Sequence, residues 1–212
     1  MKAILFDLDG TLTDTLRLVL SSLGAALGPV WGEERSPDEI RRLLGPSELR
    51  ILEQEAPGRP EVVEAFYRHY RARLHHDACV FHGVRPMLAT LAERGWPLGL
   101  VTSKGARGTA ITLEEFGLRR FFRAVVHGDE VRATKPDPEA IRLCLQRLLI
   151  PPEEAVYVGD QPTDLVAARA AGCGAWAAAW GHPPSAPQDW DCVALAPDDI
   201  LHHCLRRAPP AR

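Results

Sequence analysis

Short apolar segments alternate with segments of helical periodicity along most of this chain, and that alternation restricts its fold more than any other feature. The apolar segments have the length of strands and lie at residues 3–6, 97–102, 123–127, 155–158, 174–179 and 191–195. They lack a clean two-residue alternation, which is typical of strands covered on both faces. Strands that alternate with helices predict an α/β fold, in which a parallel sheet has helices on both sides.

Four helices are predicted between these strands, at residues 84–94, 106–116, 138–149 and 163–171. Gly95, Gly117 and Gly172 follow three of them, where glycine commonly ends a helix. Asp137 is the predicted N-cap of the helix at 138–149, with Pro138 in its first turn. The helix boundaries therefore agree with the strand assignments.

Residues 15–81 do not follow the alternation. Their patterns are helical, they contain no convincing strand, and Ser36-Pro37-Asp38-Glu39 has the spacing of a capping box. We therefore predict a helical insertion at 15–81 and an α/β core built from 1–14 and 82–212. The tail from Pro209 is expected to fray.

The composition excludes several classes of protein. A chain of 212 residues with 46% hydrophobic residues can bury an ample core, and a net charge of −3 gives no reason to expect nucleic acid as a partner. No apolar run approaches the length of a membrane span, and the first residues do not resemble a signal peptide. We expect a cytoplasmic protein of unknown oligomeric state. Its five scattered cysteines predict reduced thiols rather than disulfides or a zinc site.

The first strand runs directly into FDLDGTLTDT, which holds Asp7, Asp9 and Asp14. A solvated turn is one interpretation, since Asp and Gly suit turns. A calcium-binding EF-hand fails on spacing, because Thr11, Leu12 and Leu18 occupy the required ligand and glycine positions. A magnesium site at the end of a buried strand is the third interpretation. The first segment alone does not decide between the turn and the magnesium site.

Polar residues also follow the other strands. Thr102-Ser103-Lys104 ends the second, Lys135 precedes Pro136-Asp137-Pro138, and Asp160 and Asp164 lie in GDQPTD after the fourth. In a parallel sheet, the carboxyl ends of the strands meet at one edge, so these groups should converge in one cleft. Lysine occurs only at positions 2, 104 and 135 in a chain otherwise rich in arginine, which suggests that Lys104 and Lys135 are needed as compact charges.

Four motifs in this order, FDLDGT, VTS, KPDP and VGDQPTD, resemble those of the haloacid dehalogenase superfamily. The chain is most similar to the phosphoglycolate phosphatase-like group of phosphatases, which has a Rossmann-like core and an inserted helical cap. The resemblance covers nearly the whole chain. It implies a hydrolase that uses Mg²⁺ and acts on a small phosphorylated metabolite.

The resemblance also implies a role for each motif residue. Asp7 would be the nucleophile that forms an aspartyl-phosphate, Asp9 the acid–base group, and Lys135 the cation that neutralises charge. The metal ligands would be Asp7, Asp160, the backbone carbonyl of Asp9 and, directly or through water, Asp164. The substrate would be held by Gly10, Thr11, Thr102, Ser103 and Lys104. Because Asp9 is an acid, the resemblance favours ester or anhydride hydrolysis over dehalogenation.

Several points stay open from the sequence. Asp14 is expected to cap the first helix of the insertion and to hold the junction between the insertion and the core. Substrate-selecting residues of the cap are expected among Arg41, Arg42, Ser47, Glu48 and Arg50. Phosphoglycolate is the favoured substrate type, although pyrophosphate or a sugar phosphate would also fit. A phosphosugar mutase and a non-catalytic binding protein on the same scaffold are the alternatives.

Overall fold

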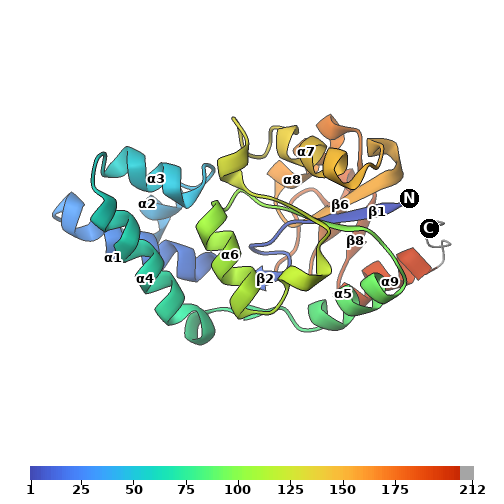
Figure 1. Ribbon diagram of the computed structural model, residues 1–212, viewed down its shortest axis with the longest axis horizontal. Coiled ribbons are helices and arrows are strands. Elements are labelled where there is room, and N and C mark those ends of the chain that lie inside the picture. Colours follow the sequence, from blue (N-terminus) through green and yellow to red (C-terminus); the bar gives the residue numbers. More distant parts are fainter. Residues whose placement is uncertain (206–212) are drawn as a thin grey trace.

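The computed structural model describes residues 1–205 and contains a six-stranded sheet with the strand order β5-β4-β1-β6-β7-β8 (Figure 1). Every neighbouring pair in this sheet is parallel. Its strands are β1 (Ala3–Phe6), β4 (Leu98–Val101), β5 (Ala124–Val126), β6 (Ala155–Gly159), β7 (Gly174–Ala178) and β8 (Cys192–Ala194). All six predicted strands are therefore confirmed, and so is the α/β fold. Residues 206–212, which include the tail from Pro209, lie outside the described part.

Helices cover both faces of the sheet, and each face has its own apolar cluster. Ile4 and Phe6 of β1 pack into the cluster on the side of α5 (Val84–Glu93) and α9 (Pro197–Leu205). Leu5 packs into the cluster on the side of α7 (Glu139–Leu148) and α8 (Pro162–Ala171). Strand β1 is consequently buried on both faces, which explains its continuous apolar run. Helix α6 (Ala106–Glu115) follows β4 and also belongs to the core.

Four helices fill most of the chain between β1 and α5, and they group together at one end of the molecule (Figure 1). They are α1 (Leu16–Trp31), α2 (Pro37–Arg41), α3 (Glu48–Glu55) and α4 (Pro60–Asp77), which we call the helical segment. The predicted capping box is present at α2, where Ser36 and Glu39 bond reciprocally. Val62, Phe66 and Tyr70 are spaced four residues apart and form one buried face of α4.

The chain leaves and re-enters the core through a short antiparallel ladder. Thr13 and Asp14 form β2 (Thr13–Asp14) and pair with β3 (Cys79–Val80). The prediction of no strand within residues 15–81 is thus wrong at β3, because two residues are too few to produce a periodic pattern. The predicted capping role of Asp14 is also wrong. Thr15 is the N-cap residue of α1, and no side chain there makes a capping bond.

The N-cap residue of α7 also differs from its prediction. Pro138, not Asp137, is the N-cap residue of α7, although Asp137 Oδ1 still accepts the backbone N–H of Glu139 at 2.9 Å. Asp137 therefore satisfies a free N–H group of the first turn, although it lies one residue before the N-cap residue instead of occupying that position itself. Within residues 1–205, no helix combines the length and apolarity needed to cross a bilayer.

Candidate active site

Strands β1, β4 and β6 are adjacent in the sheet, and their carboxyl ends bring three of the predicted segments together. Asp7 follows β1, Thr102 follows β4, and Asp160 follows β6. Gly10 turns the chain back over this edge with φ +92°, and a Cβ there would lie 2.5 Å from Asp160 Oδ2. Only glycine suits this position, because it permits both the positive φ and the close approach.

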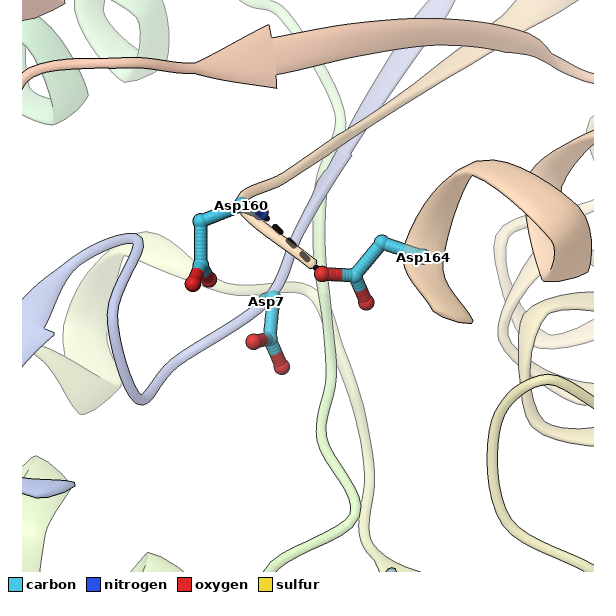
Figure 2. A group of neighbouring side chains, drawn as sticks. All are labelled: Asp7, Asp160 and Asp164. Carbon is cyan, nitrogen blue, oxygen red and sulfur yellow. Dashed lines mark hydrogen bonds between the residues drawn. The ribbon is translucent and has the colours of Figure 1, made fainter. Parts of the chain in front are cut away.

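Three buried carboxylates lie together at this edge. Asp7, Asp160 and Asp164 each offer an oxygen, and these atoms lie within 4.8 Å of one another (Figure 2). Burial raises the pKa of Asp7 well above its usual value, and the charges of Asp164 and Asp160 add to this rise. Burial and Asp164 likewise raise the pKa of Asp160. An all-oxygen group that resists carrying its full negative charge fits a hard divalent cation.

Lys135 is the cation that the structure places against these acids. Its Nζ lies 2.7 Å from Asp7 Oδ1 and 2.6 Å from Asp164 Oδ1, and it donates to the Tyr157 hydroxyl at 2.9 Å. Burial alone would lower the pKa of Lys135, but Asp164 and Asp7 raise it above its usual value, so the ammonium stays charged. One ammonium stands beside three carboxylates and contacts two of them, so it offsets their charge only in part.

Asp164 is already engaged by protein donors. Its Oδ2 accepts the backbone N–H groups of Asp160 at 3.1 Å and Gln161 at 2.9 Å, while Oδ1 faces Lys135 (Figure 2 shows the bond from Asp160). Asp164 stands in the first turn of α8, where a carboxylate satisfies free N–H groups. This arrangement suits a residue that organises the site more than one that offers a free ligand oxygen.

The Asp9 carboxylate lies apart from the three clustered acids. Lys104 Nζ lies 3.0 Å from its Oδ1 and 3.2 Å from its Oδ2, and Thr15 also donates to Oδ1. Lys104 is 7% exposed and lies over the Tyr70 ring at 4.8 Å. Asp7 and Asp9 therefore have different partners, as two carboxylates with different tasks require. A contact between a metal and the Asp9 carbonyl stays a prediction.

The predicted substrate-holding residues are only partly gathered around one space. A cleft of about 440 Å³ is lined by Gly10, Thr102, Ser103 and Lys104 together with the site acids. Thr11 is fully buried, and its hydroxyl donates to Asp160 Oδ1 at 2.9 Å instead of facing the cleft. The Thr11 hydroxyl therefore orients the Asp160 carboxylate, and this role could not be predicted from the position of Thr11 in the motif.

The helical segment closes the other side of this cleft. Arg41 and Glu48 line it, together with the apolar side chains of Leu16, Leu44 and Ile51. The other three candidates of this segment lie elsewhere. Ser47 caps α3 and donates to Asp129, Arg50 donates to the backbone carbonyls of Val131 and Arg132, and Arg42 is exposed.

Three residues of the site escaped the sequence analysis. Tyr157 donates its hydroxyl to the Val101 carbonyl at 3.0 Å while it accepts from Lys135. His182 Nε2 lies 3.1 Å from Asp160 Oδ2, and Gln161 donates to the same oxygen. A tyrosine inside a buried apolar strand was a usable signal, because a buried hydroxyl needs a partner. His182 follows β7 in a segment without a motif.

Known proteins resemble this chain in both sequence and structure. The sequence pattern of the family described as haloacid dehalogenase-like hydrolase matches residues 4–178. The chain is 34% identical over 184 residues to pyrophosphatase PpaX of Bacillus pumilus, covering 85% of this chain and 84% of that protein. It is 33% identical over 211 residues to the phosphoglycolate phosphatase of Pseudomonas savastanoi pv. phaseolicola, covering 94% and 77%. The crystal structure of a predicted phosphoglycolate phosphatase from Haemophilus somnus matches with a TM-score of 0.80 at 25% identity, covering 96% and 97%.

Proposed function

The chain belongs to the haloacid dehalogenase-like hydrolase family and is a phosphatase, and from this premise we propose that it is a Mg²⁺-dependent enzyme that hydrolyses a small phosphorylated metabolite through an aspartyl-phosphate. The observation that carries the proposal is the group of Asp7, Asp160 and Asp164 around Lys135, at the base of a cleft of about 440 Å³. A carboxylate nucleophile and a phosphate dianion repel each other, so such a site needs positive charge beside both the carboxylate and the phosphate.

The donor set fits magnesium. All three clustered acids offer oxygen, which Mg²⁺ prefers, and one lysine leaves their charge incompletely offset. Asp7 and Asp160 would hold the ion directly, with the Asp9 carbonyl, and Asp164 would act through water or by position, in keeping with its occupied oxygens. When bound, the ion supplies positive charge that lowers the repulsion between Asp7 and the phosphate.

In the proposed reaction, an Asp7 oxygen attacks phosphorus in line, and the bond between phosphorus and the ester oxygen breaks. Asp9 gives its proton to the departing oxygen, and then removes a proton from the water that hydrolyses the aspartyl-phosphate. Lys135 stays beside Asp7 and offsets charge throughout. The Thr102 hydroxyl and the backbone N–H groups near Gly10 and Ser103 would hold the phosphate oxygens.

We further propose that residues 15–81 form a cap on a core made of 1–14 and 82–212. The segment lines one side of the cleft while the chemistry lies on the other, which suits a lid that excludes water and selects the substrate. Arg41 and Lys104 are the cleft cations available to the non-reacting end of the substrate. An anionic end, as in phosphoglycolate, is favoured for this reason.

A pyrophosphatase is the second candidate, and the 34% identity to a pyrophosphatase PpaX supports it. Hydrolysis of p-nitrophenyl phosphate by wild type and Asp7→Asn, with Mg²⁺ or with EDTA, tests the chemistry. Magnesium-dependent release that the substitution abolishes is expected. Phosphoglycolate, pyrophosphate and sugar phosphates would then be compared by kcat/KM. Inertness toward all of them would overturn hydrolysis, and turnover of a sugar phosphate only with a bisphosphate activator would indicate a mutase.

A further inference from the structure

The loop between α2 and α3 is fastened to the core beside the cleft. Ser47 Oγ donates to Asp129 Oδ1 at 2.5 Å, and Asp129 Oδ2 accepts the backbone N–H of Ala106 at 2.7 Å. Thr134 Oγ1 donates to the Gly45 carbonyl at 2.7 Å. This docking brings the first turn of α3, and with it Glu48, against the start of α6.

The core has a space beside Gly105 and Gly108 that fits the Glu48 side chain. Glu48 is 4% exposed, and its Oε2 accepts the backbone N–H of Gly105 at 2.7 Å. A methyl group on Gly108 would overlap Glu48 Oε1 and would also press on Lys104 Cε at 3.2 Å. Glycine at this helical position therefore makes room for a carboxylate from the helical segment, at the same point where the Lys104 side chain passes.

Two carboxylates act on the Lys104 ammonium, and one of them contacts it directly. Asp9 contacts its ammonium with both oxygens, and Glu48 attracts it without a direct ion pair. Burial would lower the pKa of Lys104, but Asp9, Tyr70 and Glu48 raise it above its usual value. Lys104 in turn opposes the rise that burial causes in the pKa of Glu48. The Lys104 ammonium thus has a half-buried carboxylate, Asp9, as its direct partner and a buried one, Glu48, nearby.

We infer that Glu48 is a positioning residue that serves as the second counter-ion of Lys104, so that Asp9 can leave the ammonium and turn to the departing oxygen of the substrate. The inference rests on the proposed function. Both oxygens of Asp9 face Lys104, and Asp9 must give up at least one of these contacts to act on a substrate. A buried ammonium left without a carboxylate is strongly disfavoured. Because Glu48 stays near Lys104, the ammonium keeps a carboxylate partner during the step in which Asp9 donates its proton.

A matched pair of esters can test this role. Phenyl phosphate and p-nitrophenyl phosphate have nearly the same shape, but phenolate is the poorer leaving group and depends more on protonation by Asp9. Glu48→Gln keeps an oxygen for the Gly105 N–H and removes the charge. It should lower kcat/KM for phenyl phosphate about tenfold more than for p-nitrophenyl phosphate, which is part of the effect of a general acid. Asp9→Asn, which removes the acid itself, gives the largest expected ratio between the losses of kcat/KM for the two esters.

Arg50→Ala is the matched control. It weakens the docking of the first turn of α3, through the Val131 and Arg132 carbonyls, at a point away from Lys104. It should lower kcat/KM for both esters by the same factor. A purely structural role of Glu48 predicts that equal loss for Glu48→Gln as well, and such a result would overturn the inference.

Gly108→Ala provides a second, independent measurement. The new methyl group should displace the Glu48 carboxylate, and so reproduce the selective loss on phenyl phosphate. In a Glu48→Ala background it should add little, because the carboxylate that it displaces is gone. Additive losses of kcat/KM in this double-mutant cycle would refute the claim that Gly108 acts by making room for the Glu48 carboxylate. A wild-type enzyme that hydrolyses neither ester nor any metabolite phosphate would overturn the proposed function itself, whereas an active wild type with equal losses overturns the role of Glu48 alone.

Discussion

Replacing Lys135 by methionine should destabilise the metal-free protein more than any surface substitution of a lysine. The ammonium is buried and lies 2.7 Å from Asp7 Oδ1 and 2.6 Å from Asp164 Oδ1. Removing one partner of a buried ion pair costs about 3–5 kcal/mol, because the other charge stays buried without compensation. Here three clustered carboxylates lose their ammonium together, so the upper half of that range is expected.

The assay is thermal and urea unfolding in EDTA and in excess Mg²⁺. A loss of 3–5 kcal/mol corresponds to a drop in Tm of roughly 6–20 °C, at about 2–4 °C per kcal/mol for a chain of this size. Magnesium should recover part of this loss, because an ion that binds only the folded state stabilises it. The gain in Tm on adding Mg²⁺ should therefore be larger for Lys135→Met than for wild type.

Lys2→Met is the control for this experiment. It makes the same chemical change in an ion pair of similar length, at 2.8 Å to Glu154, but the Lys2 side chain is 51% exposed. An exposed pair contributes about 0–1 kcal/mol. Equal losses for the two variants in EDTA would refute the argument that Lys135 offsets a buried excess of negative charge.

Three other substitutions follow from the site. Asp7→Asn should abolish activity yet raise stability in EDTA at neutral pH by about 1–2 kcal/mol. Burial raises the pKa of Asp7, so the cost of folding around this acid grows as the pH rises above its ordinary pKa of 3.8 and levels off above the raised pKa; the gain over wild type should therefore shrink as the pH falls toward that ordinary value. Tyr157→Phe should cost about 1–3 kcal/mol in urea unfolding, because the buried Val101 carbonyl loses its side-chain donor. Gly10→Ala, with its positive φ and its overlap with Asp160, should lose about 1–3 kcal/mol and weaken Mg²⁺ binding measured by calorimetry. Unchanged melting temperatures would contradict each of these expectations.

The fold was predictable because its main signal is local. Each strand is a short apolar run, and β1, buried on both faces, has the clearest one. The ladder between β2 and β3 was missed because its two-residue strands carry no period. The cap of α1 was misassigned because Asp14 and Thr15 are both good N-cap residues, and the pairing of Asp14 with Cys79 holds it outside the helix.

The candidate site was predictable to the extent that its residues follow strands. The sequence places Asp7, Thr102 and Asp160 at one edge as soon as the sheet is parallel. Which partners they take depends on register and side-chain reach, and these are not written in a motif. Thr11 turning to Asp160, and Glu48 reaching Gly105 from the helical segment, both depend on contacts between distant parts of the chain.

The pairing of β2 with β3 also bears on how such a chain can change over evolution. Thr13 lies opposite Val80 and Asp14 opposite Cys79, so the two ends of the 64-residue excursion between them are neighbouring strands. Opposite residues in an antiparallel pair lie only about 5 Å apart, a gap that a two-residue turn closes. The chain therefore leaves and re-enters the core at one point, and the length and sequence of the excursion can change in evolution without moving the register of β1 against β4 and β6.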